Sequence, residues 1–212
     1  YGHNPRLARC NSSQFRTTGR ANYIGIELMA TLLIPLVGPL QSWGLDAKFD
    51  LRQTAPEPSK SAAIGLLCCC LGRDRSDPVD DLAAMHFGVR VDREGSLTRD
   101  FHTAQDVVAA DGSNRKTLVS NRWYLTDAAM LAGFQSDDAS FLYSIHESLR
   151  HPCWTPCLGR RSCLPTVPLA SGGVVDLPLL EALQKANPLT SGNMPLRAVV
   201  EDSTGSQQRP DQ

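Results

Sequence analysis

The sequence lacks a long hydrophobic run and an excess of charge of one sign. Its longest apolar stretch, residues 29–40, contains two prolines and is too short to cross a bilayer. The 21 Lys and Arg residues are balanced by 22 Asp and Glu residues, which argues against a generally basic surface. We therefore expect a soluble cytoplasmic protein that has no membrane partner and confines any anion-binding site to a local cluster.

Common catalytic motifs are also absent. The sequence contains neither GxSxG nor HExxH, and "GLLCCCLG" lacks the Lys and Ser/Thr that a phosphate-binding loop requires. The remaining catalytic candidate is His102 beside Arg99, a pairing that suits a metal-independent endoribonuclease. Because a single histidine in a polar loop more often serves in hydrogen bonding or stacking, we favour a non-enzymatic protein and keep the endoribonuclease as the alternative.

The seven cysteines do not form a recognisable disulfide or zinc pattern. Cys68, Cys69 and Cys70 are consecutive within an apolar segment, which favours small core residues in a reducing compartment. A second group, with His151 nearby, has spacings of four and six residues, whereas structural zinc sites usually use tighter ligand pairs; its members are Cys153, Cys157 and Cys163. We expect no metal and no cofactor.

The two ends of the chain differ in composition from its centre. Residues 1–28 carry four arginines and one acidic residue without apolar periodicity. We interpret this segment as a disordered non-native or upstream extension before a natural start at Met29, with an organellar transit peptide as the alternative. The polar tail "EDSTGSQQRPDQ" predicts a disordered end or a truncation.

Periodicity between the ends predicts an α+β protein. Strands are expected at residues 31–37, 85–92 and 126–134, because β-branched or alternating apolar residues dominate there. Helices are expected from the Ser59 cap to the Gly72 stop and at residues 137–150. Their predicted inner faces are Ile64, Leu67, Cys68 and Leu71 in the first helix and Phe141, Leu142, Ile145 and Leu149 in the second. With an irregular final strand, this is the element order of a ferredoxin-like split βαβ unit.

A long polar segment separates the second and third predicted strands. It predicts a functional or flexible insertion, or a hairpin extended away from the body. Basic and aromatic side chains are frequent in it, which suits single-stranded RNA, where bases stack on aromatic rings and phosphates pair with cations. These residues are Arg99, His102, Arg115, Lys116, Arg122, Trp123 and Tyr124.

Positive charge is most concentrated around "PCLGRRSC", residues 156–163. From Arg150 to Arg161 there are three arginines and no acidic residue. Arginine binds phosphate oxygens through two N–H groups, and Gly159 allows backbone N–H groups to approach the same anion. The segment predicts an anion site, to which Lys60 at a helix N-terminus adds a second contact. A solvated loop, or arginines paired with acidic residues from elsewhere in the chain, is the alternative.

Five segments in order resemble the CasD family of type I-E CRISPR Cascade subunits, within the RAMP superfamily. They are "LLIPLVGPLQSWG", "SKSAAIGLLCCCLGRDRSD", "FGVRVDREGSLTRDFHTAQ", "RWYLTDAAMLAGF" and "PCLGRRSCLPTVPL". The resemblance implies a ferredoxin-like, RRM-related core at residues 29–172, with a β-hairpin thumb at about 95–126 and a truncated extension at 173–212. It also implies a non-catalytic, crRNA-binding subunit in antiviral defence that holds the 5′ handle. Its implied partners are the Cascade backbone subunit and the large PAM-reading subunit.

The resemblance also implies a set of RNA contacts. Gln41 and Trp43 are expected near the handle, Lys60 and Ser61 at the start of the first helix, and the remaining residues on the thumb or in the arginine loop. These remaining residues are Arg99, His102, Arg122, Gly159, Arg160 and Arg161.

Two residues depart from the family pattern. Pro35 interrupts the first strand, so that strand needs an edge or a bulge there. Cys157 stands where an aromatic residue is common.

Overall fold

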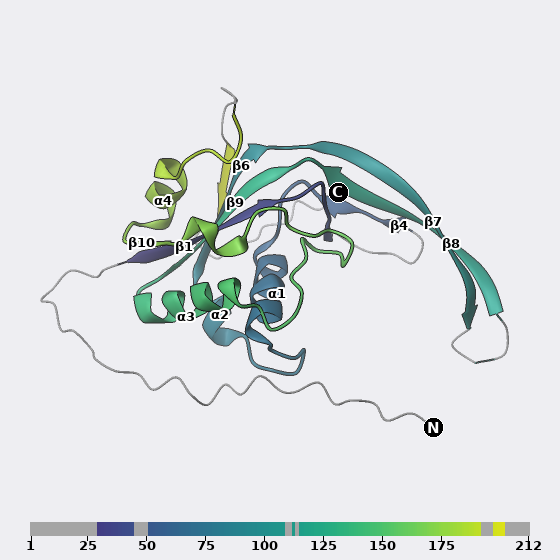
Figure 1. The fold of residues 1–212 in the computed structure, drawn as a ribbon, viewed down its shortest axis with the longest axis horizontal. Coiled ribbons are helices and arrows are strands. Elements are labelled where there is room, and N and C mark those ends of the chain that lie inside the picture. Colours follow the sequence, from purple (N-terminus) through teal and green to yellow (C-terminus); the bar gives the residue numbers. More distant parts are fainter. Residues whose placement is uncertain (1–28, 45–50, 109–111, 113–114, 192–196, 202–212) are drawn as a thin grey trace, which may run out of the picture.

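The computed structural model describes residues 29–44, 51–108, 112, 115–191 and 197–201. An antiparallel five-stranded sheet forms the body, and a long hairpin arches away from it (Figure 1). The sheet order is β10-β1-β9-β6-β11. These strands are β1 (Ala30–Val37), β6 (His86–Arg93), β9 (Ala129–Ser136), β10 (Val174–Val175) and β11 (Arg197–Val200).

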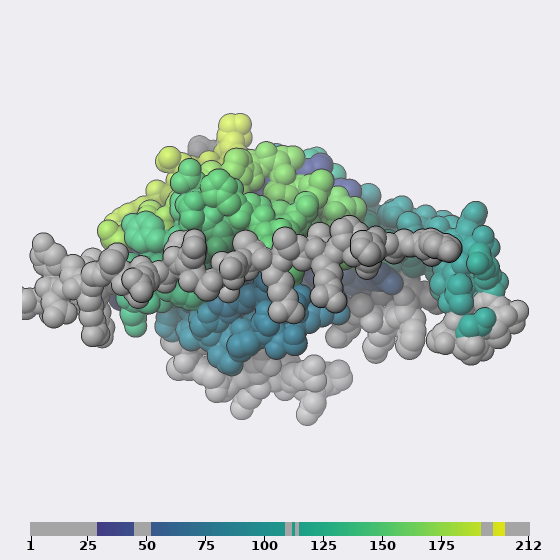
Figure 2. All heavy atoms as spheres, turned by 60° about the horizontal axis from the view of Figure 1, so that its bottom comes forward, coloured from purple at the N-terminus to yellow at the C-terminus, as the bar shows by residue number. Residues whose placement is uncertain are grey.

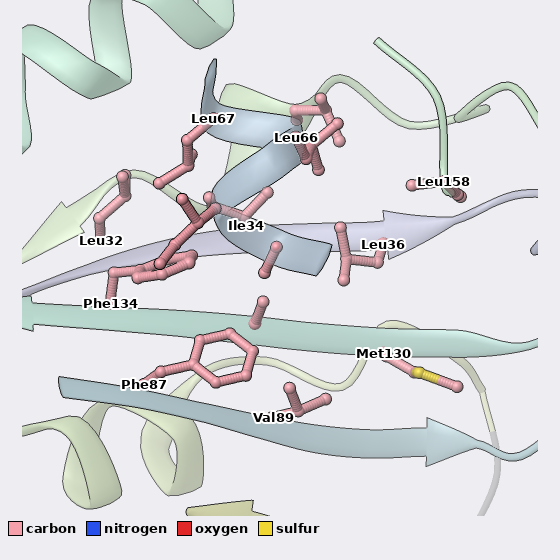
Figure 3. Close-up of a cluster of buried hydrophobic side chains, with 14 of the residues drawn as sticks. Leu32, Ile34, Leu36, Leu66, Leu67, Phe87, Val89, Met130, Phe134 and Leu158 are labelled. Carbon is pink, nitrogen blue, oxygen red and sulfur yellow. The ribbon is translucent and has the colours of Figure 1, made fainter. Parts of the chain in front are cut away.

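The core lies on the face of the sheet that α1 (Lys60–Leu71) and α3 (Ala139–Arg150) cover. Alternate residues of β1 point to this face, and Leu32, Ile34 and Leu36 are each at most 1% exposed. Figure 3 shows Leu66 and Leu67 of α1 over these strands. Each fully buried side chain of this size contributes about 1.5–3 kcal/mol to folding.

The opposite face of the sheet packs against a shorter helix, α4 (Leu179–Lys185). Leu33 and Leu131 point to this face and form a second apolar cluster with Leu179, Ala182 and Leu183. Both α4 and β10 lie beyond the predicted domain boundary at residue 172, yet they belong to the same sheet and its cover.

Both predicted helices form where their end signals lie. The Ser59 hydroxyl accepts from the Ala62 N–H at 3.3 Å, and Gly72 ends α1 with a φ of 73°. The carboxylate of Asp138 caps α3 in the same way. The predicted face of α1 is partly wrong, because it buries Ala63, Ile64, Leu66, Leu67 and Cys70, whereas Cys68 and Leu71 are only half-buried. Of the three consecutive cysteines, therefore, only Cys70 is a core residue.

Pro35 is accommodated in β1 without a bulge. Leu33 directs its N–H away from β9, to the carbonyl of Gly173 at 2.9 Å. Alternate residues of a strand direct their N–H groups to the same side, so the missing N–H of Pro35 falls on that side as well. There β10 pairs with β1 only at residues 31 and 32. Pro35 therefore removes no hydrogen bond between β1 and β9. Its missing N–H faces the side of β1 on which β10 does not reach this far along the strand.

The long polar segment forms the hairpin of β7 (Ser96–Val108) and β8 (Arg115–Thr126). Its register shifts between Ala104 and Val107. Figure 2 shows the hairpin standing out at one end of the molecule. The third predicted strand, residues 126–134, forms as β9 but begins and ends later, at Ala129 and Ser136, because residues 115–126 belong to the hairpin.

Short elements complete the described chain. Two of the short strands pair with the base of β8 and two with each other. These elements are β2 (Leu40–Gln41), β3 (Trp43–Gly44), β4 (Leu51–Arg52), β5 (Thr54–Ala55), α2 (Asp80–Ala83) and η2 (Leu169–Gly172). Among the described helices, none is both long and apolar enough to cross a membrane.

Candidate nucleic-acid interface

An open groove of about 710 Å³, here called the first groove, lies beside the base of the hairpin. One face of α1, the short strand β4 and the loop of residues 157–163 supply its walls. Arg52 and Arg160 line it, and none of its described lining residues is Asp or Glu. The other lining residues are Ser42, Gly44, Gln53, Ser59, Ser61, Ala62, Gly65, Leu66, Cys69, Cys157 and Gly159. The first groove is therefore a cationic hollow that suits an anion.

Arg160 joins three segments that are distant in sequence. Its guanidinium donates to the carbonyl of Trp123 at 3.2 Å and to that of Arg52 at 2.9 Å, and it lies 4.7 Å from the centroid of the Tyr124 ring. Among the described residues, the partners of Arg160 are thus carbonyl groups and an aromatic ring, and not the acidic residues of the predicted alternative. Carbonyl partners do not neutralise the charge, so Arg160 both braces the hairpin and makes the first groove positive.

Gly159 allows the arginine loop to lie against the chain after β1. A Cβ at this position would lie 1.8 Å from the Ser42 carbonyl oxygen, and the φ of Gly159 is +93°. Its N–H donates to the Cys157 carbonyl at 2.9 Å. Because that N–H is used within the loop, Gly159 itself does not offer it to an anion, and the predicted approach of the loop's backbone N–H groups to an anion stays a prediction. The glycine serves close packing instead.

The two predicted phosphate contacts at the start of α1, Lys60 and Ser61, point to different sides of the helix. Ser61 lines the first groove, and its hydroxyl lies 3.1 Å from that of Ser59. Lys60 turns to the other side, where its Nζ lies 2.9 Å from a carboxylate oxygen of Glu201. The structure therefore pairs Lys60 with an acid outside the first groove, which differs from its predicted role.

Gln41 and Trp43 alternate along the chain with Ser42 and Gly44, which line the first groove, and are themselves at most 1% exposed. The Gln41 amide donates to the carbonyls of Leu36 and Ala128, both at 2.8 Å, and accepts from the Trp43 indole N–H at 3.1 Å. Their prediction as direct RNA contacts is therefore not matched by their position. Buried in this way, they fix the chain that leads from β1 to the groove.

The three predicted hairpin residues do not share a face. Alternate residues of a strand point to opposite faces, so Arg99 lies on one face and His102 on the other. Arg99 stacks over Trp123, with its guanidinium 5.9 Å from the ring centroid. Arg122 shares the face of His102 and of Tyr124, on which Arg160 packs. This separation speaks against Arg99 and His102 acting together on one phosphate.

Arg161 does not line the first groove, as its neighbour Arg160 does, but a second hollow. This second groove, of about 530 Å³, is lined by Cys69, Trp154, Thr155, Cys157 and Arg161. Burial raises the pKa of the Cys69 and Cys157 thiols. Both thiols line the first groove as well, so the two hollows share a wall.

The cysteine and histidine group of residues 151–163 does not gather around a common point. Within the described ranges, no three His, Cys, Asp or Glu side chains lie close enough together to hold a metal ion. Cys163 is instead fully buried, and its backbone carbonyl accepts from the Leu158 N–H at 2.7 Å.

Comparison with known proteins places this geometry in a family. A family model described as "CRISPR-associated protein (Cas_Cas5)" matches residues 31–212. The chain belongs to the Cas5 family. The resemblance to the CasD family inferred from the sequence motifs is also confirmed, because the chain is 35% identical over 159 residues to the CRISPR system Cascade subunit CasD of Escherichia coli (strain K12). That match covers 66% of this chain and 70% of the relative.

Two solved structures resemble this Cas5 family member. One belongs to a "CRISPR RNA-guided surveillance complex", with a TM-score of 0.61 and 37% identity; the match covers 66% of this chain and 61% of that chain. The other is titled "Crystal structure of Cas protein", with a TM-score of 0.67 and 40% identity over 83% of this chain and 82% of that chain. This chain thus spans less than two thirds of the first structure's chain.

Sequence patterns missed several groove residues. Arg52 belongs to the two-residue strand β4, within a sequence segment that has no apolar periodicity, so only its basic side chain marks it. Cys69 and Gly65 belong to a helix whose groove-facing side carries small residues, which periodicity does not distinguish from a core face.

Proposed function

We propose that this protein is a non-catalytic crRNA-binding subunit of a type I-E Cascade and that the first groove binds the repeat-derived 5′ handle. The observation that carries the proposal is a groove lined by Arg52 and Arg160 with no acidic residue in the part of its lining that the structure describes. The N-terminus of the 12-residue helix α1 lies at the same groove and adds partial positive charge. RNA backbone phosphates are the anions that such a site suits.

The fold supports the same proposal. The strands β10, β1, β9 and β6 have the spatial order fourth, first, third and second, which is the order expected of a ferredoxin-like core of the RAMP type. On this interpretation residues 29–172 hold most of that core, and the hairpin within residues 95–126 is its thumb. By similarity to the Cascade subunit CasD, the partners are the Cascade backbone subunit and the large PAM-reading subunit. On this proposal the protein acts in the cytoplasm and uses no cofactor.

The proposal is tested by binding of a labelled handle RNA over a salt series. Arg52→Ala removes a side-chain charge from the first groove, although its backbone carbonyl still accepts from Arg160. We expect weaker binding and a salt slope reduced by about 0.7, the value for one phosphate contact on a single strand. Arg75→Ala is the matched control, because Arg75 is an exposed arginine that does not line the groove. Equal affinities and slopes for the two variants would exclude the first groove as the RNA site.

The alternative is a metal-independent endoribonuclease that uses His102 with Arg99. Their positions on opposite faces of the hairpin argue against it. Incubation of the protein with repeat RNA in EDTA tests the point directly. We expect intact RNA with both the wild type and His102→Ala. A specific product that disappears with His102→Ala would instead establish the enzyme.

A further inference from the structure

The second groove has the chemistry of a nucleotide site. Its volume of about 530 Å³ lies within the range of small-ligand pockets, about 300–1,000 Å³. Trp154 and Arg161 line it, and none of its described lining residues is acidic. An indole ring and a guanidinium in one hollow are groups that can bind an unpaired base and its phosphate.

Arg161 is available to an incoming anion. Within the described chain, its side chain forms no ion pair or hydrogen bond, and it is exposed. By contrast, Arg73, Arg90 and Arg197 each have a carboxylate partner. Since Arg161 has no ion-pair partner among the described residues, it contributes little to stability, and its charge can pair with a ligand.

Trp154 is held in place by its backbone, and its side chain is not part of the core. Its N–H donates to the Cys69 carbonyl at 3.2 Å, and its carbonyl lies 3.7 Å from the Cys69 thiol. The residue is nevertheless 41% exposed. A large apolar ring on a fixed backbone at the surface is a pre-arranged stacking platform.

The second groove continues the first. Cys69 and Cys157 line both hollows, and the adjacent residues Arg160 and Arg161 each line one of them. Together the described lining residues of the two grooves include three arginines and no acid. Two other hollows differ, since Glu57 and Glu201 line one and three aspartates line another. A further hollow, on α3, has Arg150 and no acid among its described lining residues, but it shares no residue with the first groove. Continuity and uniform charge favour one RNA strand over a peptide as the common ligand.

We propose that the RNA strand crosses the wall formed by Cys69 and Cys157 and places one further nucleotide in the second groove. Its base stacks on Trp154, and its phosphate binds Arg161. This inference rests on the proposed function of the first groove, and it adds a subsite that reads the RNA as a single strand.

An abasic scan of the handle RNA tests the stacking contact. We expect Trp154→Ala in the full chain to lower affinity about 5- to 150-fold, the range for loss of one base–aromatic stack. One abasic position should lower wild-type affinity by a similar factor and have no further effect on Trp154→Ala. Trp154→Phe, which keeps a ring, should retain most of the affinity. Tyr143→Ala is the control, because Tyr143 is an exposed aromatic residue on α3 and lines neither groove.

Arg161→Ala tests the phosphate contact independently. We expect the salt slope to fall by about 0.7, while the thermal midpoint of unfolding stays unchanged because the side chain has no described partner. Arg75→Ala again supplies the control for loss of one exposed arginine.

The possible outcomes separate the two proposals. If the wild type shows no salt-dependent binding of the handle, the proposed function itself fails. If Arg52→Ala weakens binding but Trp154→Ala and Arg161→Ala do not, only the second-groove subsite is overturned. Trp154→Ala that binds RNA normally but no longer joins the Cascade backbone subunit would also overturn it, in favour of a protein-docking surface.

Discussion

The guanidinium of Arg160 lies 4.7 Å from the centroid of the Tyr124 ring, so a side chain of the arginine loop fixes the base of the hairpin. The same guanidinium donates to carbonyls of β8 and β4. Together with the pairing of β2 and β4 to β8, Arg160 therefore positions the hairpin relative to the first groove. If the first groove binds RNA as proposed, we expect binding and hairpin placement to be coupled through Arg160.

Arg160→Ala should destabilise the hairpin base by about 1–3 kcal/mol, because it removes the cation–π contact and two hydrogen bonds from a charged donor. Hydrogen exchange of the β4 and β8 amides is the measurement, and faster exchange there than in β1 and β9 is the expected result. Arg161→Ala is the neighbouring control and should leave exchange unchanged. Equal protection in both variants would contradict the bracing role.

Gly159→Ala should destabilise the protein by about 3 kcal/mol or more. The added Cβ would lie 1.8 Å from the Ser42 carbonyl oxygen, at a φ of +93°. Gly44→Ala is the matched control, since Gly44 lines the same groove and a Cβ there meets nothing within 4 Å. Urea unfolding measures both variants. A Gly159→Ala protein as stable as Gly44→Ala would mean that the loop does not pack on Ser42.

Gly65→Gln should increase the stability of the protein and lower its affinity for RNA. A Cβ at Gly65 meets nothing within 4 Å, and the residue lies in α1 facing the first groove. Replacing a helical glycine should stabilise the protein by about 0.5–1 kcal/mol, while the longer side chain fills the groove and lowers RNA affinity at least about 10-fold. Gly65→Ala should give a similar gain in stability with little loss of binding. Affinity retained by Gly65→Gln would place the RNA elsewhere.

Asp92→Ala should cost about 3–5 kcal/mol of unfolding free energy. Its carboxylate pairs with Arg90 at 2.6 Å, and both side chains are at most 2% exposed, so the variant leaves a buried charge without its partner. Lys185→Ala, which breaks the exposed pair with Glu181, is the control and should change stability by less than about 0.5 kcal/mol. Similar losses in the two variants, measured by urea unfolding, would refute this account.

Stability should fall in alkaline solution partly because of Cys70. Burial raises the pKa of its thiol from 9.0 to about 12. The unfolded chain thus loses this proton first, and the stabilising contribution, complete below pH 9, is lost as the pH rises toward 12. Unfolding free energies of wild type and Cys70→Ala are compared from pH 8 upward. The wild type should show the steeper decline, by at most about 1.4 kcal/mol per pH unit; parallel curves would contradict the prediction.

The sequence predicted those elements whose signals are local. The cap at Ser59, the stop at Gly72 and the alternation in β6 each depend on a few neighbouring residues, and each element formed close to its expected bounds. Helix α4 was missed because its seven residues follow a proline-rich segment and carry a weak periodic signal. The hairpin was foreseen as one possibility among three, since a long polar segment does not specify its register.

The sequence predicted which residue types form the candidate site. Only the tertiary structure shows how these residues are arranged. Two adjacent arginines and a glycine were visible in the sequence, but which arginine braces the hairpin depends on Tyr124 and Arg52, which lie 36 and 108 residues away from Arg160. Gln41 was likewise expected to contact RNA, but it is buried and instead holds the chain after β1 in place. Local patterns fix secondary structure because its bonds are local, whereas a site depends on which distant segments meet, and packing of the whole core decides that.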